Sequence, residues 1–424
     1  MKVTCNINVH HLTRVEGHGN IRIVIKNGQV EEASWDVVET PRFFEALLVG
    51  KLWENAPYIC GRICGICSIG HTLASIRAIE NGFGIVPTGQ TSALRLLLKH
   101  METLQSHILH LYFLAAPDFL RIGSVLPLIE THPDIVQRAT RLKLLANDAC
   151  DVIGGRRLHP TRPVVGGFTM LPEKSQLALL KSRIEAAVPD LVKTAQLFHG
   201  FSLPDFVRET EFVSLQGKDN YPFIGGDLVS SDGVLRAEEE YLRMTNEFVV
   251  GHSTSKWSRL SRHSFAAGAL ARVNNNFAFL HPRAREIAES FSLRPVNHNP
   301  FMNNIAQLVE CVHVVFDSIS LLDKLLAMDW QEPRQQVRPK AGLGVGAVEV
   351  PRGILYHAYE FDDSGRITRA DCVIPTSQNN ANIHYDIAEL ARQSASQGKS
   401  DSEIQLLAEM LVRAYDPCIS CSVH

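Results

Sequence analysis

The chain has 424 residues, of which 45% are hydrophobic, enough to fill the core of one large domain or of two to three smaller ones. Its 42 basic and 45 acidic residues give a formal net charge of −3, so the charge gives no indication of a nucleic-acid-binding surface. No long apolar run and no basic-then-apolar leader is apparent, so we expect a cytoplasmic location and no direct membrane insertion.

The N-terminal part of the chain has the pattern of a β-hairpin. Isoleucine recurs at every second position over 21–25, and the pair Asn27 and Gly28 that follows is typical of a type I′ turn. We therefore predict a β-rich part over residues 1–60.

Four long segments carry apolar residues every three to four positions, over lengths too great for strands, which indicates helices. The last of them is apolar nearly all round, and this predicts a central helix. Together they predict a helical bundle over residues 61–330. The four segments are 91–116, 134–155, 175–199 and 301–328.

A second β pattern follows near the C-terminus, over 352–374, with a turn at "DDSG". We predict a β patch and a metal-binding segment over residues 331–424. The whole of 1–424 is expected to be a single domain of the mainly α (α+β) class. It would consist of a central long-helix bundle with small peripheral β-hairpins and sheets.

Three cysteines stand close together in "YICGRICGICSIGH" (58–71), where Cys60, Cys64 and Cys67 form a C-x3-C-x2-C array. This spacing resembles that of radical S-adenosylmethionine enzymes, in which three thiolates hold a four-iron cluster. That alternative predicts alternating strands and helices after the motif, as in a barrel. The chain continues instead into long helical patterns.

A second C-x2-C pair, Cys418 and Cys421, lies in the last motif, "YDPCISCSVH". Two such pairs offer four thiolates, which favour zinc, iron–sulfur units or a thiophilic ion such as nickel. A zinc-stapled structural subunit of a redox complex is therefore a further alternative. Zinc ribbons, however, separate their pairs by about 15 to 20 residues, whereas these pairs stand near opposite ends of the chain.

The residues around the two pairs resemble the large subunit of nickel–iron hydrogenases. The length and the last motif are most similar to the cytoplasmic, bidirectional branch that includes sulfhydrogenases and other NAD(P)-linked enzymes. The matching motifs follow one another along the whole chain: "RVEGHG" (14–19), "PRFFEALLVGK" (41–51), "RICGICSIGH" (62–71), "EVPRG" (349–353), "VIPTSQN" (373–379) and "DPCISCSVH" (416–424).

The resemblance implies a nickel–iron centre whose iron carries carbon monoxide and cyanide. Cys64 and Cys418 are expected to be terminal nickel ligands, and Cys67 and Cys421 are expected to bridge nickel and iron. The implied reaction is the reversible heterolytic cleavage of dihydrogen to two protons and two electrons.

Cys60 has no role in the family pattern and is expected to be a small buried side chain. The same expectation holds for Cys5, Cys150, Cys311 and Cys372. Because no further cysteine pair exists for an iron–sulfur relay, electrons are expected to pass to an iron–sulfur small subunit. From there we expect them to reach NAD(P) or a similar carrier through flavin and iron–sulfur diaphorase subunits.

The resemblance also assigns residues around the metals. Arg352 is expected over the open nickel–iron position, where a fixed cation polarises dihydrogen. Asp416 and Asp118 are expected to anchor this arginine. His71 is expected to donate a hydrogen bond to the bridging sulfur of Cys67.

Glu16 matches the carboxylate that passes protons to and from a terminal cysteine, here Cys418. Pro351, Pro375 and Thr376 match positions that line the diatomic ligands of the iron, with hydrogen-bond donors available for cyanide.

Glu45 and His424 match ligands of a second, hard cation, magnesium or iron, together with a main-chain carbonyl near Asn380. Family precursors carry an extension after this histidine that a maturation endopeptidase removes. A chain that ends at His424 is therefore expected to be the matured form, with its last segment buried over the metals.

Overall fold

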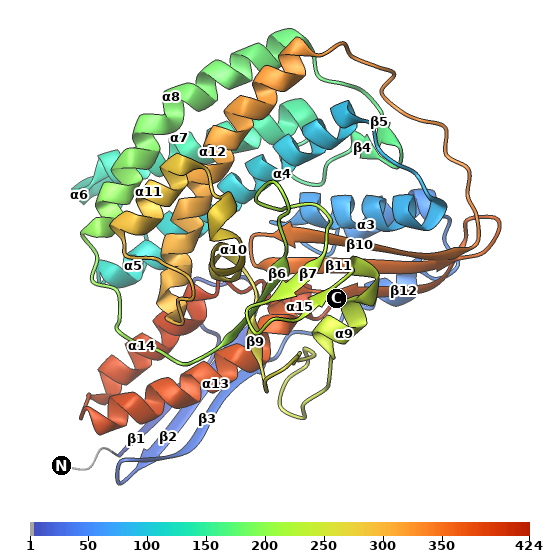
Figure 1. The fold of residues 1–424 in the computed structure, drawn as a ribbon. Helices are drawn as coiled ribbons and strands as arrows, with labels where there is room; N and C mark the ends of the chain where they lie inside the picture. The colour runs from blue at the N-terminus through green and yellow to red at the C-terminus, as the bar shows by residue number, and fades with distance from the viewer. Residues whose placement is uncertain (1–3) are drawn as a thin grey trace.

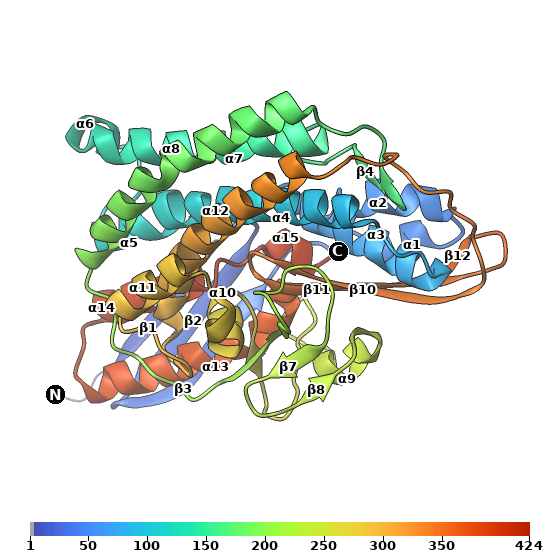
Figure 2. The ribbon, with the colours of Figure 1, turned by 45° about the horizontal axis from the view of Figure 1, so that its top comes forward.

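The computed structural model describes residues 4–424 and confirms a mainly α fold with small sheets (Figure 1). Four long helices from the middle of the chain pack together on one side of the molecule, and the N-terminal sheet lies on the other side together with two C-terminal helices (Figures 1 and 2). The C-terminus lies near the middle of the molecule in both views, beside the short last helix.

The N-terminal sheet contains the predicted hairpin. Its antiparallel strands are β1 (Cys5–Val9), β2 (Gly19–Lys26) and β3 (Gln29–Val37), in that order. Between β2 and β3, Asn27 and Gly28 both have positive φ, 53° and 79°, as a type I′ turn requires. The alternating isoleucines of β2 are fully buried, so the hairpin is confirmed.

Short helices lead from this sheet to the first cysteine pair. They are α1 (Phe44–Leu48), the 3₁₀ turn η1 (Trp53–Asn55) and α2 (Ala56–Cys60). The longer α3 (Ser68–Phe83) begins directly after Cys67. The first cysteine pair therefore occupies the turn between α2 and α3.

The four predicted long segments are all helical. They form α4 (Gly89–Leu109), α7 (Pro133–Gly154), α8 (Lys174–His199) and α12 (Asn303–Ala327). Helix α12 packs against both α4 and α8. The stretch Pro300–Ala327 is long and apolar enough to cross a membrane, but 78% of its most apolar window is buried inside the fold, as expected for a core helix.

Helix α4 continues into a π-helical turn, η2 (His110–Ala115), and then α5 (Ala116–Phe119). Short π-helical segments are rare and are found frequently at functional sites. Here the turn directs His110 towards the C-terminal part of the chain, where its Nε2 lies 2.7 Å from the main-chain oxygen of Arg413.

A four-stranded sheet within the expected helical part was not predicted. Its order is β8-β7-β6-β9, with β6 (Glu211–Leu215) antiparallel to β7 (Leu228–Ser230) and parallel to β9 (Phe265–Ala266). The outer strand β8 is Leu235–Arg236. All five residues of β6 are buried and the other strands are very short, so no alternation marks them in the sequence.

The C-terminal sheet is antiparallel, in the order β10 (Gly342–Val350), β11 (Gly353–Phe361) and β12 (Ile367–Val373). Helix α3 packs on it at very short range. A Cβ atom on Gly344 or Gly346 would lie only 2.0 or 2.5 Å from a main-chain oxygen of α3. The glycines of "GLGVG" thus allow the close approach that brings the first cysteine pair against this sheet.

The last part of the chain consists of α13 (Pro375–Ser396), α14 (Asp401–Ala414) and α15 (Ile419–Ser422), and α13 packs on β3. The remaining short elements are α6 (Leu128–Thr131), β4 (Pro163–Val164), β5 (Gly167–Phe168), η3 (Glu238–Glu240), α9 (Tyr241–Thr245), α10 (Ala269–Asn276), η4 (Phe277–Phe279), α11 (Pro282–Ser290) and η5 (Pro300–Met302).

Candidate metal centre

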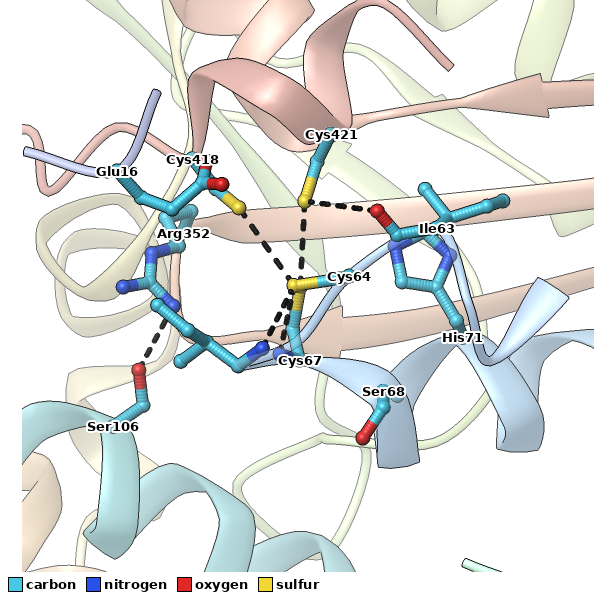
Figure 3. Close-up of a disulfide and its surroundings, with 12 residues drawn as sticks. Glu16, Ile63, Cys64, Cys67, Ser68, His71, Ser106, Arg352, Cys418 and Cys421 are labelled. Atoms are coloured by element: carbon cyan, nitrogen blue, oxygen red, sulfur yellow. Dashed lines mark hydrogen bonds between the residues drawn. A yellow bond between two sulfur atoms is a disulfide. The ribbon is translucent and has the colours of Figure 1, made fainter. Parts of the chain in front are cut away.

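Four cysteines from the two ends of the chain meet in the interior (Figure 3). The Sγ atoms of Cys64 and Cys418 are 3.7 Å apart, and those of Cys67 and Cys421 are 4.0 Å apart. All four sulfur atoms lie within 4.8 Å of one another, and all four residues are buried. Metal–sulfur bonds of about 2.3 Å in a tetrahedron separate sulfur atoms by about 3.8 Å, so the distances from the first pair to the second fit one shared metal site.

Main-chain N–H groups around the first cysteine pair would stabilise a negative charge on the sulfur of Cys64. The N–H groups of Ile66 and Cys67 point at the Sγ of Cys64, at 3.3 and 2.9 Å. Cys64 and Cys67 form a disulfide in this structure, and its reduction by two electrons yields the two thiolates that metal binding requires.

The second pair is held by the N-terminal segment. Residue Glu16 forms a parallel bridge with Cys418, and the N–H of Ile419 donates to the main-chain oxygen of Glu16 at 2.9 Å. A hydrogen bond with Cys421, burial and the charge of Glu16 raise the pKa of the Cys418 thiol well above its usual value, although Arg352 opposes this. A thiol in such surroundings becomes a thiolate when a metal cation replaces its proton.

A buried arginine stands beside the second pair. The Nε and Nη2 atoms of Arg352 donate to the main-chain oxygen and to Oδ1 of Asp416, both at 2.8 Å, and its Nη1 donates to Ser106 at 2.8 Å (Figure 3). Burial lowers the pKa of this guanidinium, but interactions with Asp416, Cys418 and Cys421 outweigh burial and raise the pKa above its usual value. Arg352 is therefore a permanent cation in a fixed orientation.

Comparison with known proteins identifies this arrangement. The family described as "Nickel-dependent hydrogenase" matches residues 42–141 and 252–424, which include all four cysteines and Arg352, and a family described as "HoxL-like" matches residues 6–40. The chain belongs to the nickel-dependent hydrogenase family.

Individual hydrogenases match over nearly the full length of the chain. Sulfhydrogenase 1 subunit alpha of Pyrococcus furiosus is 38% identical over 420 residues, which cover 99% of this chain and 97% of that protein. The NAD-reducing hydrogenase HoxS subunit beta of Cupriavidus necator is 27% identical over 464 residues, covering 97% and 93%. A crystal structure of an NAD⁺-reducing [NiFe]-hydrogenase in the H₂-reduced state superposes with a TM-score of 0.88 at 27% identity, covering 99% and 100%.

These matches and the cysteine geometry support a nickel–iron centre in this hydrogenase large subunit. The three-cysteine alternative is wrong, because Cys64 and Cys67 join Cys418 and Cys421 while Cys60 belongs to a different group of side chains. The zinc-stapled alternative is rejected by the family assignment.

Asp118 does not anchor Arg352 in this hydrogenase, so that prediction is wrong. Its two carboxylate oxygens accept hydrogen bonds from Arg413 at 2.7 and 2.9 Å, and Arg14 pairs with it as well. Because both oxygens are engaged, Asp118 fastens the N-terminal segment and α14 to α5 instead. Asp416 alone of the two acids pairs with Arg352.

Two further residues support Asp416, and the sequence analysis missed both. The Nε2 of Gln307 donates to Oδ2 of Asp416 at 3.2 Å, and His110 of the π-helical turn contacts the side-chain oxygen of Gln307. The signal available in the sequence was a set of polar residues on a largely apolar helix, because buried amides need partners.

His71 lies in α3 and is fully buried. Its Nδ1 is 3.1 Å from Nε2 of His357, and its ring makes no hydrogen bond to the Cys67 sulfur among the residues that the structure describes. Burial and the neighbouring charges of His357 and His424 lower the pKa of His71 well below its usual value, so the ring is neutral.

The three residues expected around the iron ligands are buried at two junctions. Pro351 precedes Arg352 between β10 and β11, and Pro375 and Thr376 begin α13. The Oγ1 of Thr376 accepts a hydrogen bond from the N–H of Cys418 at 3.1 Å. Its own hydroxyl proton remains available to a further acceptor.

Glu45 and His424 lie together, as predicted for a cation site. The Nε2 of His424 is 3.3 Å from Oε1 of Glu45, which also accepts a hydrogen bond from the N–H of Cys372 at 2.9 Å. Burial favours the neutral acid, but His424 and this N–H outweigh it and lower the pKa of Glu45 to about 2. The carboxylate is therefore ionised, as a hard cation requires.

Asn380 does not join this pair. It lies inside α13, where main-chain carbonyls are occupied by the helix itself, and its side chain bonds to Trp35 and Ser255 at 3.0 and 2.9 Å. Ser255 in turn donates to the main-chain oxygen of Ser422 at 3.0 Å. Asn380 thus helps to fix the C-terminal segment, and the structure does not support its predicted place beside the cation.

Proposed function

We propose that this chain is the catalytic subunit of a nickel–iron hydrogenase, which cleaves dihydrogen heterolytically and reversibly to two protons and two electrons. The observation that carries the proposal is the meeting of two C-x2-C pairs within 4.8 Å, beside a buried arginine. When bound, the nickel–iron centre supplies the two-electron chemistry. The protein holds the metals and moves the protons.

We assign Cys64 and Cys418 as terminal nickel ligands and Cys67 and Cys421 as bridges to iron, in agreement with the family pattern. Their spacing and burial support a thiolate site closed to water. Carbon monoxide and cyanide on the iron belong to the same proposal. The free hydroxyl proton of Thr376 supports it, because cyanide nitrogen accepts hydrogen bonds.

Arg352 acts as a preorganised cation. Its three donors are bound to Asp416 and Ser106, so the guanidinium is held without motion at the side of the second cysteine pair. Fixed charge in a site without water stabilises developing negative charge more strongly than a mobile charge does. Arg352 therefore polarises dihydrogen and keeps its proton.

Glu16 receives the proton that leaves the terminal cysteine Cys418. Figure 3 shows its carboxyl group on the Cys418 side of the cluster. The carboxylate accepts hydrogen bonds from the main-chain N–H and the hydroxyl of Ser420. Glu16 is only partly buried, so a proton taken up there is close to the protein surface.

We propose a hard cation, magnesium or iron, at Glu45 and His424. An ionised carboxylate and an imidazole at 3.3 Å support this assignment. Such an ion would fasten the last residue of the chain to α1. The buried C-terminal segment also supports the action of a maturation endopeptidase on a precursor, before this segment closes over the metals.

Electrons are proposed to leave through an iron–sulfur small subunit. The segment from the end of β3 through α2, which leads to the first cysteine pair, exposes large apolar side chains, as expected for a surface that another subunit covers. They are Val38, Phe43, Leu47, Val49, Leu52 and Tyr58. NAD(P) as the acceptor is supported by the names of two similar proteins, both NAD-reducing hydrogenases. A diaphorase subunit with flavin and iron–sulfur clusters is part of the same proposal.

Metal analysis with infrared spectroscopy on the purified complex tests the proposal. We expect one nickel per large subunit, iron in excess of nickel because the iron–sulfur partner also contains iron, and absorption bands of bound carbon monoxide and cyanide. Absence of nickel, or of these bands, in protein from cells supplied with nickel would overturn it.

A further inference from the structure

A second group of soft side chains lies apart from the four-cysteine centre. Cys60 ends α2, His357 lies on β11 and Cys372 lies on β12. One sulfur or nitrogen atom from each lies within 4.8 Å of the other two, and all three residues are fully buried. Cys60 and Cys372 are therefore more than the isolated small side chains that the sequence predicts.

The distances within this group are those of a metal site. The Sγ of Cys372 is 3.7 Å from Nδ1 of His357. Tetrahedral zinc, with bonds of about 2.3 Å to sulfur and about 2.0 Å to nitrogen, places these two ligand atoms about 3.6 Å apart. The hydroxyl of Tyr359 lies 3.1 Å from the Sγ of Cys60 and 2.6 Å from the same Nδ1, so it is hydrogen-bonded within the group, and its bond to Nδ1 would be exchanged for a metal bond when an ion enters.

We propose that Cys60, Cys372 and Nδ1 of His357 bind a zinc ion, with Tyr359 or a water molecule in the fourth position. Two thiolates balance the charge of Zn²⁺, and the thiol protons leave to solvent when the ion binds.

The proposed ion is connected by one hydrogen bond to His71, which lies in the helix that begins after Cys67. The Nε2 of His357 lies 3.1 Å from Nδ1 of His71. When a metal occupies Nδ1 of His357, its proton is on Nε2, and that N–H donates to His71. The remaining proton of His71 is then on its own Nε2. The zinc ion thus sets the tautomer of the histidine next to the first cysteine pair.

Zinc and nickel are counted together in the purified hydrogenase complex, in the wild type and in three serine variants. We expect about one zinc per chain in the wild type, the same in Cys311→Ser, and loss of zinc in Cys60→Ser and Cys372→Ser. Cys311 is a matched control, because it is fully buried and lies outside both groups. Zinc absent from the wild type, or retained in Cys60→Ser, would overturn the proposal.

X-ray absorption at the zinc edge of the wild-type protein identifies the ligand atoms of the zinc, and it does not depend on the folding of any variant. Two sulfur and two nitrogen or oxygen ligands are expected. Four sulfur ligands would place the zinc in the nickel–iron site, and a spectrum without sulfur ligands would place it on the protein surface. Either result would overturn the proposed zinc site. Nickel content is measured in the same samples. Nickel without zinc would overturn the zinc site alone, whereas absence of nickel would overturn the hydrogenase assignment.

Discussion

The sulfur atoms of Cys64 and Cys418 lie 3.7 Å apart, although 354 residues separate them along the chain. Two N-terminal segments hold the last residues in place. Glu16 bridges to Cys418, and the N–H of Arg42 donates to the main-chain oxygen of Val423 at 2.9 Å. The metal centre is therefore completed only when the C-terminal segment has docked inside the fold.

The first prediction concerns the thiolate that the C-terminal segment adds to the metal centre. Cys418→Ser replaces a soft thiolate by a hydroxyl, which binds nickel poorly. We expect nickel content and dihydrogen turnover to fall below detection. Cys311→Ser is the control, because a serine in α12 can bond to the carbonyl four residues earlier, and it should retain both. Full nickel content and turnover in Cys418→Ser would contradict the ligand assignment.

The second prediction concerns the fixed cation. Lysine at position 352 keeps the charge but cannot bind Asp416 and Ser106 with three donors in one plane. We expect Arg352→Lys to lower kcat by about 10²- to 10³-fold, the usual loss for a preorganised electrostatic group, with nickel content unchanged. The measurement is dihydrogen uptake with an artificial acceptor, with Arg138→Lys, whose partner is the exposed Asp134, as the control. Equal rates in the two variants would refute the role.

Sequence and structure agree where a pattern is local. The hairpin at Asn27 and Gly28 and the long helices follow from neighbouring residues, and the cysteine pairs follow from motifs that resemble one family. Which side chains pair with one another is not visible in such patterns, because it depends on the packing of segments that are distant in the sequence. Asp118 binds Arg413, 295 residues away, rather than the predicted arginine.

The same reason explains the other differences. Cys60 and Cys372 carry no common motif, and only the packing of α2 against the C-terminal sheet brings them to His357. The four-stranded sheet was missed because its strands are too short for alternation to be visible. Sequence patterns predicted which elements form, whereas the contacts between them required the structure.

The third prediction tests the proton path. Glu16→Gln keeps a side-chain oxygen for the N–H of Ser420 but can no longer carry a proton. We expect dihydrogen turnover to fall by about 10²- to 10⁴-fold, as for loss of a general acid–base group. The infrared bands of the metal centre should stay as in the wild type. Glu39→Gln, which changes a nearby carboxylate paired with His18, should leave turnover intact. Turnover near the wild-type level in Glu16→Gln would exclude it from the path.

The fourth prediction concerns stability at low pH. His313 is buried on α12, and its Nδ1 accepts a hydrogen bond from the N–H of His281 at 3.0 Å, which requires the neutral ring. Burial, together with the charge of His281, lowers its pKa to about 4 from 6.5, although Glu310 opposes this. Between these values the unfolded chain binds a proton that the folded chain does not. The free energy of unfolding therefore falls as the pH decreases from about 6.5 to about 4.

The magnitude follows from the difference in proton binding. For this one histidine we expect a loss of about 2 kcal/mol between pH 6.5 and pH 5, since each pKa unit corresponds to about 1.4 kcal/mol. His313→Gln keeps an acceptor for the N–H of His281 and does not titrate, so its loss over the same range should be smaller by that amount. Urea unfolding of both proteins at the two pH values measures it. Equal losses in the two proteins would mean that His313 is protonated in the folded state.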